Sequence, residues 1–222
     1  MAQGDLCAAK PHCFPMFQNK GAGVHFSFYF SRAYTCMKKS FFARLSGLSL
    51  VVMAVVAGVA YGYAFQQLYH PHDGEATLRN FLHRRDLYYM VLGGFTLILM
   101  LDLLVAWTLY RFFETAHPVL PRMMAATRVL YALFLVVALV HWGRMNGSTN
   151  AVEVTHHIQR FLTIWSLGLI VFGVHLLLLG ALILRAPVIP SWMGYLAAFA
   201  GLSYVAIHTL HALWTGFARS PA

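Results

Sequence analysis

The chain has 222 residues, of which 59% are hydrophobic and only 10% are charged, and its formal net charge is +9. A soluble globular domain carries about 25% charged residues, so this composition excludes an ordinary water-soluble fold and indicates an integral membrane protein. The basic residues are spread over loops and span ends and form no stripe, which argues against nucleic-acid binding. We interpret them as topology signals and as contacts to lipid headgroups.

Residues 1–36 differ in composition from the rest of the chain. This basic stretch contains all three cysteines and shows no helical period. Because no cysteine follows it, the membrane domain, residues 37–222, is expected to depend on neither disulfides nor thiol chemistry. Met37 is followed by Lys38, Lys39 and a hydrophobic run, as at the start of many membrane proteins. Two interpretations therefore stay open: an N-terminal tail, or a mis-called start.

Five hydrophobic stretches follow, each long enough to cross a hydrocarbon core of about 30 Å. The clearest covers residues 161–184, where the only ionisable side chain is His175. The other four are expected at about 45–65, 87–110, 121–141 and 191–214. Every proline lies outside the interiors of these spans, as unbroken helices require. The sequence therefore predicts an all-α, polytopic transmembrane helix bundle.

The connections between spans are predicted to be loops. Pro71 and Gly74 are expected to break any helix in residues 66–86, and the polar segment 142–157 is interpreted as a second loop. Basic residues are divided almost evenly between the two sides of the bundle. Only the basic residues of the tail and the usual dominance of the first helix favour a cytoplasmic N-terminus.

Three ionisable residues lie deep inside the predicted spans. Asp102, Arg128 and His175 come from three different helices, at about 12, 10 and 14 Å from the inner helix ends. Charged side chains in a membrane normally face the bundle and pair, so we expect an Asp102–Arg128 ion pair with His175 as a third, hydrogen-bonding partner. The pair could be structural or a ligand or proton site, and Arg128 could instead reach the headgroups.

Histidines provide a second candidate site. On the last span, Tyr204, His208 and His211 share one helical face, and His141 ends the third span at a similar level. His141 with His208 or His211 could ligate haem axially or bind a transition metal. The sequence has no C-x-x-C-H motif, however, and no carboxylate accompanies these histidines. We therefore predict no cofactor, with haem or a transition metal kept as the alternative to an interfacial role.

Small residues indicate where helices could pack closely. Gly58 and Gly62 form a GxxxG pair in the first span, a spacing that allows close approach of a second helix. The other candidate packing positions are Gly168, Gly194 and Gly201.

No catalytic motif is present. The chain lacks H-E-x-x-H, a phosphate-binding glycine loop and G-x-S-x-G, each of which marks a known class of active site. Asp102 is the only acid within the spans, so paired carboxylates inside the bundle are excluded. Enzymatic activity is not expected.

Several segments together resemble a known family. They are DLLVAWTLYRFF at residues 102–113, ATRVLYALF at 126–134, FGVHLLLLGALI at 172–183 and IPSWMGYLAAFAGLSYV at 189–205. Over about residues 44–208 the chain resembles the bacterial domain-of-unknown-function family 4386 (DUF4386). The resemblance implies a multi-pass protein of the bacterial cytoplasmic membrane and suggests that Asp102, Arg128 and His175 match recurrent polar positions. It supplies no activity, and because members often have six spans, a sixth stays open here.

Three hypotheses for function follow. The first is a non-enzymatic membrane protein that holds a small amphiphile or a partner helix around the Asp102–Arg128–His175 layer. The second is a redox component that binds haem or metal through the outer histidines. The third is a proton-coupled carrier, which without an inverted repeat would have to be an oligomer. Expected partners are the lipid bilayer and a second copy or another membrane protein, and no nucleic acid.

Overall fold

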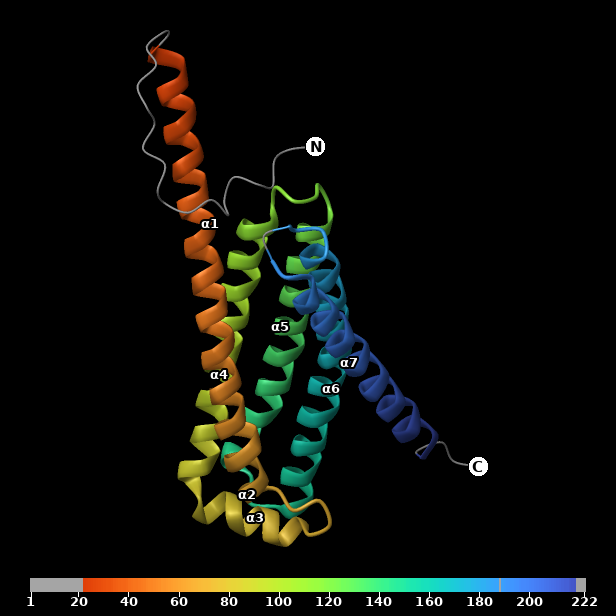
Figure 1. Cartoon of the computed structure of the whole chain (residues 1–222). Helices are drawn as coiled ribbons and strands as arrows, with labels where there is room; N and C mark the ends of the chain where they lie inside the picture. The colour runs from red at the N-terminus through yellow and green to blue at the C-terminus, as the bar shows by residue number, and fades with distance from the viewer. Residues whose placement is uncertain (1–21, 188, 219–222) are drawn as a thin grey trace.

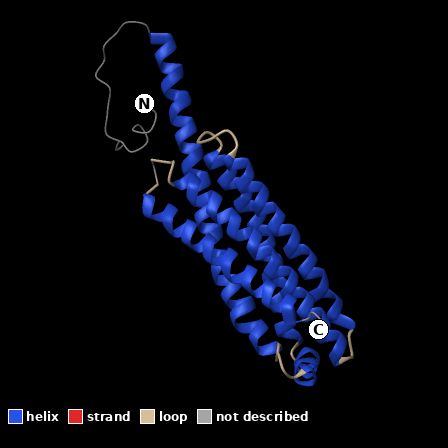
Figure 2. Cartoon of the chain, turned by 90° about the vertical axis from the view of Figure 1, so that its right-hand side faces the viewer, coloured by secondary structure: helices blue, strands red, loops and turns tan. Residues whose placement is uncertain are grey.

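The computed structural model describes residues 22–187 and 189–218, and within them every regular element is helical (Figure 2). Five rods of this part are long and apolar enough to cross a membrane. The first runs from Ser40 to Leu68 and consists of the second half of α1 (Ala22–Ala57), the π-helix η1 (Gly58–Phe65) and α2 (Gln66–Leu68). The others lie in α4 (Arg85–Phe113), α5 (Leu120–Arg144), α6 (Ala151–Ile183) and α7 (Ser191–Ala218). The predicted all-α bundle is confirmed with five spans, and the described residues contain no sixth.

Spans that follow one another in the chain pack side by side, in the order α1, α4, α5, α6, α7 (Figure 1). The helices do not form a flat layer, because the π-helical end of the first span also contacts α6. The ring centroids of Tyr61 and Trp165 are 4.8 Å apart. Four spans therefore share a core, whereas α7 packs mainly on α6. Since α6 lies between them, α5 and α7 form no extensive interface.

A short helix that the sequence did not predict, α3 (Gly74–His83), lies across one end of the bundle (Figure 1). The expectation that Pro71 and Gly74 would keep this segment a loop was wrong, because both residues precede or open the helix. Asp73 is its N-cap and accepts a hydrogen bond from the Ala76 amide at 2.8 Å, which satisfies one free N–H of the first turn. We call this end of the molecule the α3 end.

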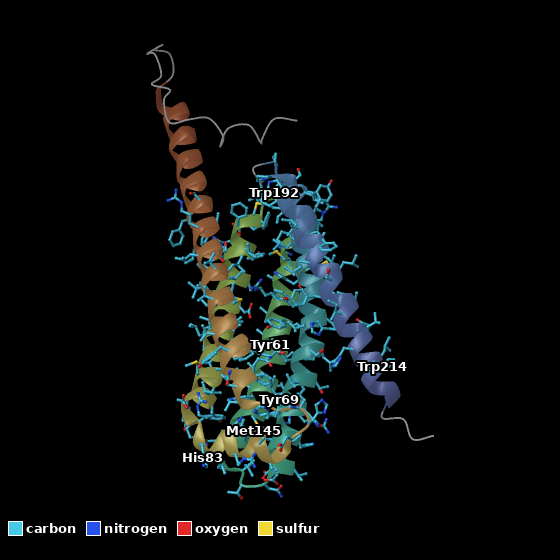
Figure 3. The ribbon with its side chains drawn as sticks, turned by 60° about the horizontal axis from the view of Figure 1, so that its bottom comes forward. Tyr61, Tyr69, His83, Met145, Trp192 and Trp214 are labelled. Atoms are coloured by element: carbon cyan, nitrogen blue, oxygen red, sulfur yellow. The ribbon has the colours of Figure 1, made fainter. Side chains whose placement is uncertain are left out.

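Aromatic side chains fill the core at the α3 end. Trp142 is completely buried, 5.5 Å from the ring of Phe81 on α3 and 5.8 Å from Tyr88 on α4, with Phe65 of η1 at 5.7 Å. Met145 and His83 also lie at this end, whereas Trp192 lies at the opposite end (Figure 3). The cluster thus fixes α3 to the three spans beneath it.

Two segments expected to be irregular belong to helices. Helix α6 begins at Ala151 and not near residue 161, because Asn150 caps it by accepting a hydrogen bond from the Val152 amide at 2.8 Å. The predicted loop 142–157 therefore shrinks to a short 3-10 turn, Met145–Gly147, and a few linking residues. Residues 22–36 are part of α1, and residues 1–21 lie outside the described part.

Among the described residues, no helix of the chain packs on the predicted GxxxG pair of the first span. A Cβ added at Gly58 or Gly62 would meet nothing within 4 Å, so both face open space. The close approach involves Gly94 of α4, where an added Cβ would lie 2.5 Å from the Cβ of Ala60. The reason is that GxxxG spacing assumes α-helical periodicity, whereas this segment is a π-helix with i→i+5 bonding.

The three other predicted glycines do lie at helix contacts. A Cβ at Gly168 would be 2.9 Å from the Cβ of Phe134 on α5. Across the α6–α7 interface, Gly201 faces Gly173, and Gly194 faces Gly180, with added Cβ atoms 2.7 to 3.1 Å from the opposite carbonyl oxygens. Gly173 and Gly180 were missed, although they provide half of each contact.

Candidate functional site

The three predicted polar residues meet in the interior of the four-span core. Asp102 on α4, Arg128 on α5 and His175 on α6 have exposed fractions of 1%, 1% and 0%. The first span contributes Met53, whose sulfur lies 3.8 Å from Arg128 Nη2. Four helices thus surround the group, which we call the polar layer. It lies about 12–16 Å along the helices from the end opposite α3.

Asp102 and Arg128 form a tight ion pair, with 2.7 Å between Asp102 Oδ1 and Arg128 Nη2. The guanidinium therefore does not extend to the headgroups, which removes that interpretation. Neither carboxylate oxygen accepts a well-directed hydrogen bond from a described residue, and Arg128 Nε also lacks a partner there. The charges are compensated, but part of the hydrogen-bonding capacity of the layer is unused.

His175 connects Arg128 to the backbone of α5. Its Nδ1 is 2.8 Å from the Met124 carbonyl oxygen, and its Nε2 is 3.0 Å from Arg128 Nη1. A carbonyl only accepts and a guanidinium only donates. Nδ1 must therefore carry the proton while Nε2 accepts, which assigns His175 as the neutral Nδ1–H tautomer. One negative and one positive charge remain, so the layer is neutral overall.

Phe172 completes the surroundings of the guanidinium. Arg128 Cζ lies 5.3 Å from the centre of its ring, a cation–π distance, and the ring stacks on His175 at 5.8 Å. Phe172 precedes His175 by three residues, so its place on the same helical face could have been recognised from spacing. No signal in the sequence points to Met53.

The outer histidines form different pairs from those predicted. His141 Nδ1 lies 3.4 Å from His157 Nδ1 on α6, whereas His208 Nδ1 lies 2.8 Å from Ser166 Oγ, also on α6. Tyr204 and His208 do share a face, since their rings stack at 5.9 Å. The pairing of His141 with His208 or His211 is not formed, because α6 separates α5 from α7.

In the described part of the chain, no group of three or more His, Cys, Asp or Glu side chains has an arrangement that could hold a metal ion. The sequence could show which face of α7 carries His208 but not which helix that face meets.

Comparison with known proteins identifies the family of the chain. The profile of the family described as "Domain of unknown function (DUF4386)" matches residues 45–220. The chain belongs to the DUF4386 family. An uncharacterised protein of Archaeoglobus fulgidus is 31% identical to this DUF4386 protein over 124 residues, which are 56% of the chain and 68% of the relative. No solved structure matches it. Residues 45–220, which the family profile matches, include all three ionisable residues of the polar layer.

Proposed function

We propose that this DUF4386 protein performs no covalent chemistry and binds another membrane helix, or the apolar chain of a small amphiphile, along α7. The polar layer supports this proposal because its side chains are closed off from lipid and water. Its side chains are at most 1% exposed and they neutralise one another, so a substrate in lipid or water does not reach them. In this proposal the layer fixes the register of the four core helices and α7 provides the binding surface.

The observation that carries the proposal is the low burial of α7. In an 18-residue apolar stretch of α7 only 6% of the residues are buried, against 22–39% in the corresponding stretches of the other four spans. One face packs on α6 through Gly194 and Gly201, while Phe199 on another face is 71% exposed. The helix leans away from the bundle toward Trp214 (Figure 3). Association of membrane helices relies on close packing, and α7 has surface free for a further contact.

Native mass spectrometry of the protein extracted with its own lipids tests the proposal. We expect a second polypeptide or an amphiphile bound at fixed stoichiometry, and we expect Phe199→Ala to weaken that binding. The matched control is Leu133→Ala on α5, which also truncates a lipid-facing side chain, 57% exposed. A bare monomer under conditions that retain lipid, or equal effects of the two substitutions, would contradict the proposal.

A proton-coupled carrier is the second candidate. Asp102 is the only acid deep inside the spans, because Asp86 and Glu153 lie in the first turns of α4 and α6, and its oxygens lack a well-directed hydrogen bond from the described residues. A carrier of this kind predicts proton uptake in proteoliposomes that Asp102→Asn abolishes while the variant stays folded. Absence of uptake by the wild-type protein would exclude it.

A haem-linked role has less support, because His141 and His208 contact different partners on α6. A Soret band in the purified protein would reverse this ranking.

The cellular setting is part of the proposal. We infer a protein of the bacterial cytoplasmic membrane with its N-terminus in the cytoplasm. The resemblance to a bacterial family and the basic residues before the first span support this placement.

A further inference from the structure

Two histidines at the α3 end are placed as a pair that neither the polar layer nor the proposed function uses. His141 lies in the last turn of α5, and His157 lies in the second turn of α6. Their Nδ1 atoms are 3.4 Å apart, and each side chain is partly exposed. The pair therefore joins two neighbouring spans at a level that solvent reaches.

The separation of the two nitrogens is that of a long, weak hydrogen bond, and it also suits a shared metal ion. A strong N–H hydrogen bond places its heavy atoms about 2.7–3.2 Å apart. Two imidazole nitrogens bound to one tetrahedral zinc ion, each at about 2.0–2.1 Å, lie about 3.3–3.4 Å from each other. The observed distance falls at this value. We propose that His141 and His157 form a two-histidine site for a zinc ion, with water in the remaining positions.

The surroundings of the pair set the strength of binding. No third His, Cys, Asp or Glu of the described residues completes a metal-binding group, and the positive charges of Arg144 and Arg160 act on His141. Both features make the site weaker than a structural zinc site with four protein ligands. The adjacent His156 is engaged elsewhere, because Arg160 Nε donates to its Nε2 at 3.4 Å.

Zinc titration of the full chain tests the site directly. The protein is purified in detergent with a tag that contains no histidine, and Zn²⁺ is added in a calorimeter at neutral pH. We expect one zinc ion per chain. His141→Gln and His157→Gln should each weaken binding about tenfold or more, because each removes one of two protein ligands. His156→Gln, a neighbouring histidine on α6, should leave the affinity unchanged.

A second measurement separates ligation from misfolding. Zinc should raise the unfolding temperature of the wild-type protein and of His156→Gln, but not of the two ligand variants, because the ion links α5 to α6 only in the folded state. Size-exclusion profiles show whether each variant is folded. Co²⁺ should give the intense visible absorption of a tetrahedral site. Equal zinc affinity of the wild type and the His141→Gln/His157→Gln double variant, or equal losses with His156→Gln, would overturn the assignment.

Discussion

Arg128 is the side chain through which the four core helices contact one another. It pairs with Asp102 of α4, hydrogen-bonds His175 of α6 and touches Met53 of α1. Charges are expensive inside a membrane unless they are compensated, and here Asp102 of α4 compensates the charge while α6 and α1 add uncharged contacts. The side chain therefore favours one register of the bundle over alternatives that would leave a charge unpaired.

The first prediction concerns the energetics of this ion pair. Asp102→Ala alone should lower the free energy of unfolding by about 3–5 kcal/mol, because it leaves the buried guanidinium without its counter-ion. Adding Arg128→Ala should restore part of that loss, because no charge is then stranded. Unfolding in mixed detergent micelles measures both.

The matched control for this prediction is Arg111→Ala, which breaks the 2.9 Å pair with Glu114 on the surface of α4. Because that pair is partly exposed, its loss should cost about 0–1 kcal/mol. A double variant as unstable as Asp102→Ala would show that the pair is not energetically coupled.

The second prediction concerns the protonation of His175. Its contacts to the Met124 carbonyl and to Arg128 require the neutral Nδ1–H form. Nitrogen NMR of histidine-labelled protein at neutral pH should therefore show one imidazole of this tautomer whose signal is missing in His175→Gln. A signal for His175 with both nitrogens protonated would contradict the assigned hydrogen bonds and make the layer positively charged.

Among the elements, the α6–α7 pair shows how closely two spans can approach. Glycines of α6 face glycines of α7 at two levels, Gly173 with Gly201 and Gly180 with Gly194. An added methyl at Gly173 would lie 2.8 Å from the Gly201 carbonyl oxygen and 3.0 Å from the Val205 amide nitrogen. Both obstacles are backbone atoms, so the helices themselves would have to separate.

The third prediction follows from this contact. Gly173→Ala should destabilise the protein by about 1–3 kcal/mol, as overpacking of a tight interface does, and should loosen α7. Gly58→Ala is the control, because open space surrounds that position and alanine lowers the entropy of the unfolded chain. Thermal unfolding of both variants measures this, with a lower unfolding temperature expected for Gly173→Ala only. Equal destabilisation would mean that GxxxG spacing, and not the observed contact, identifies the packing face.

The polar layer, the first span and α3 show what the sequence could and could not predict. The polar layer was predictable, because three charged or polar groups at similar depth in apolar spans have few partners other than one another. The packing face of the first span was not, because the π-helical stretch changes the angle between successive side chains. Helix α3 was missed although Asp73 before Gly74 is an N-cap signal, since Pro71 and Gly74 were weighted as helix breakers.

At the scale of the whole molecule, the order of helices in space decides which distant residues meet. Local periodicity correctly placed His208 and Tyr204 on one face of α7. It could not show that α6 lies between α5 and α7, which pairs His141 with His157 and leaves His208 to Ser166. Only the three-dimensional arrangement carries that information, because every span has a similar apolar pattern.

The orientation of the whole bundle gives the last prediction. Arg128 is buried in the layer and is not a topology signal, and the basic residues of the spans and loops are balanced between the two ends. Lys38 and Lys39 lie in α1 just before the apolar part of the first span, and the first helix usually dominates topology. With the N-terminus in the cytoplasm, as we propose, five spans place the end of α7 outside. Alkaline phosphatase fused after α7 should therefore be active and green fluorescent protein dark.

Replacing Lys38 and Lys39 by Gln should shift part of the population to the opposite orientation, because it removes the charges nearest the first span. The control is the replacement of Arg84 and Arg85, which lie at the start of α4 on the α3 end. Removing these two charges should strengthen the original orientation, because they are the competing signal on the other side. If the phosphatase fusion of the wild type is inactive and its green fluorescent protein fusion fluoresces, the N-terminus lies outside. The His141–His157 pair would then lie on the cytoplasmic side, where zinc would have to be supplied from the cytosol.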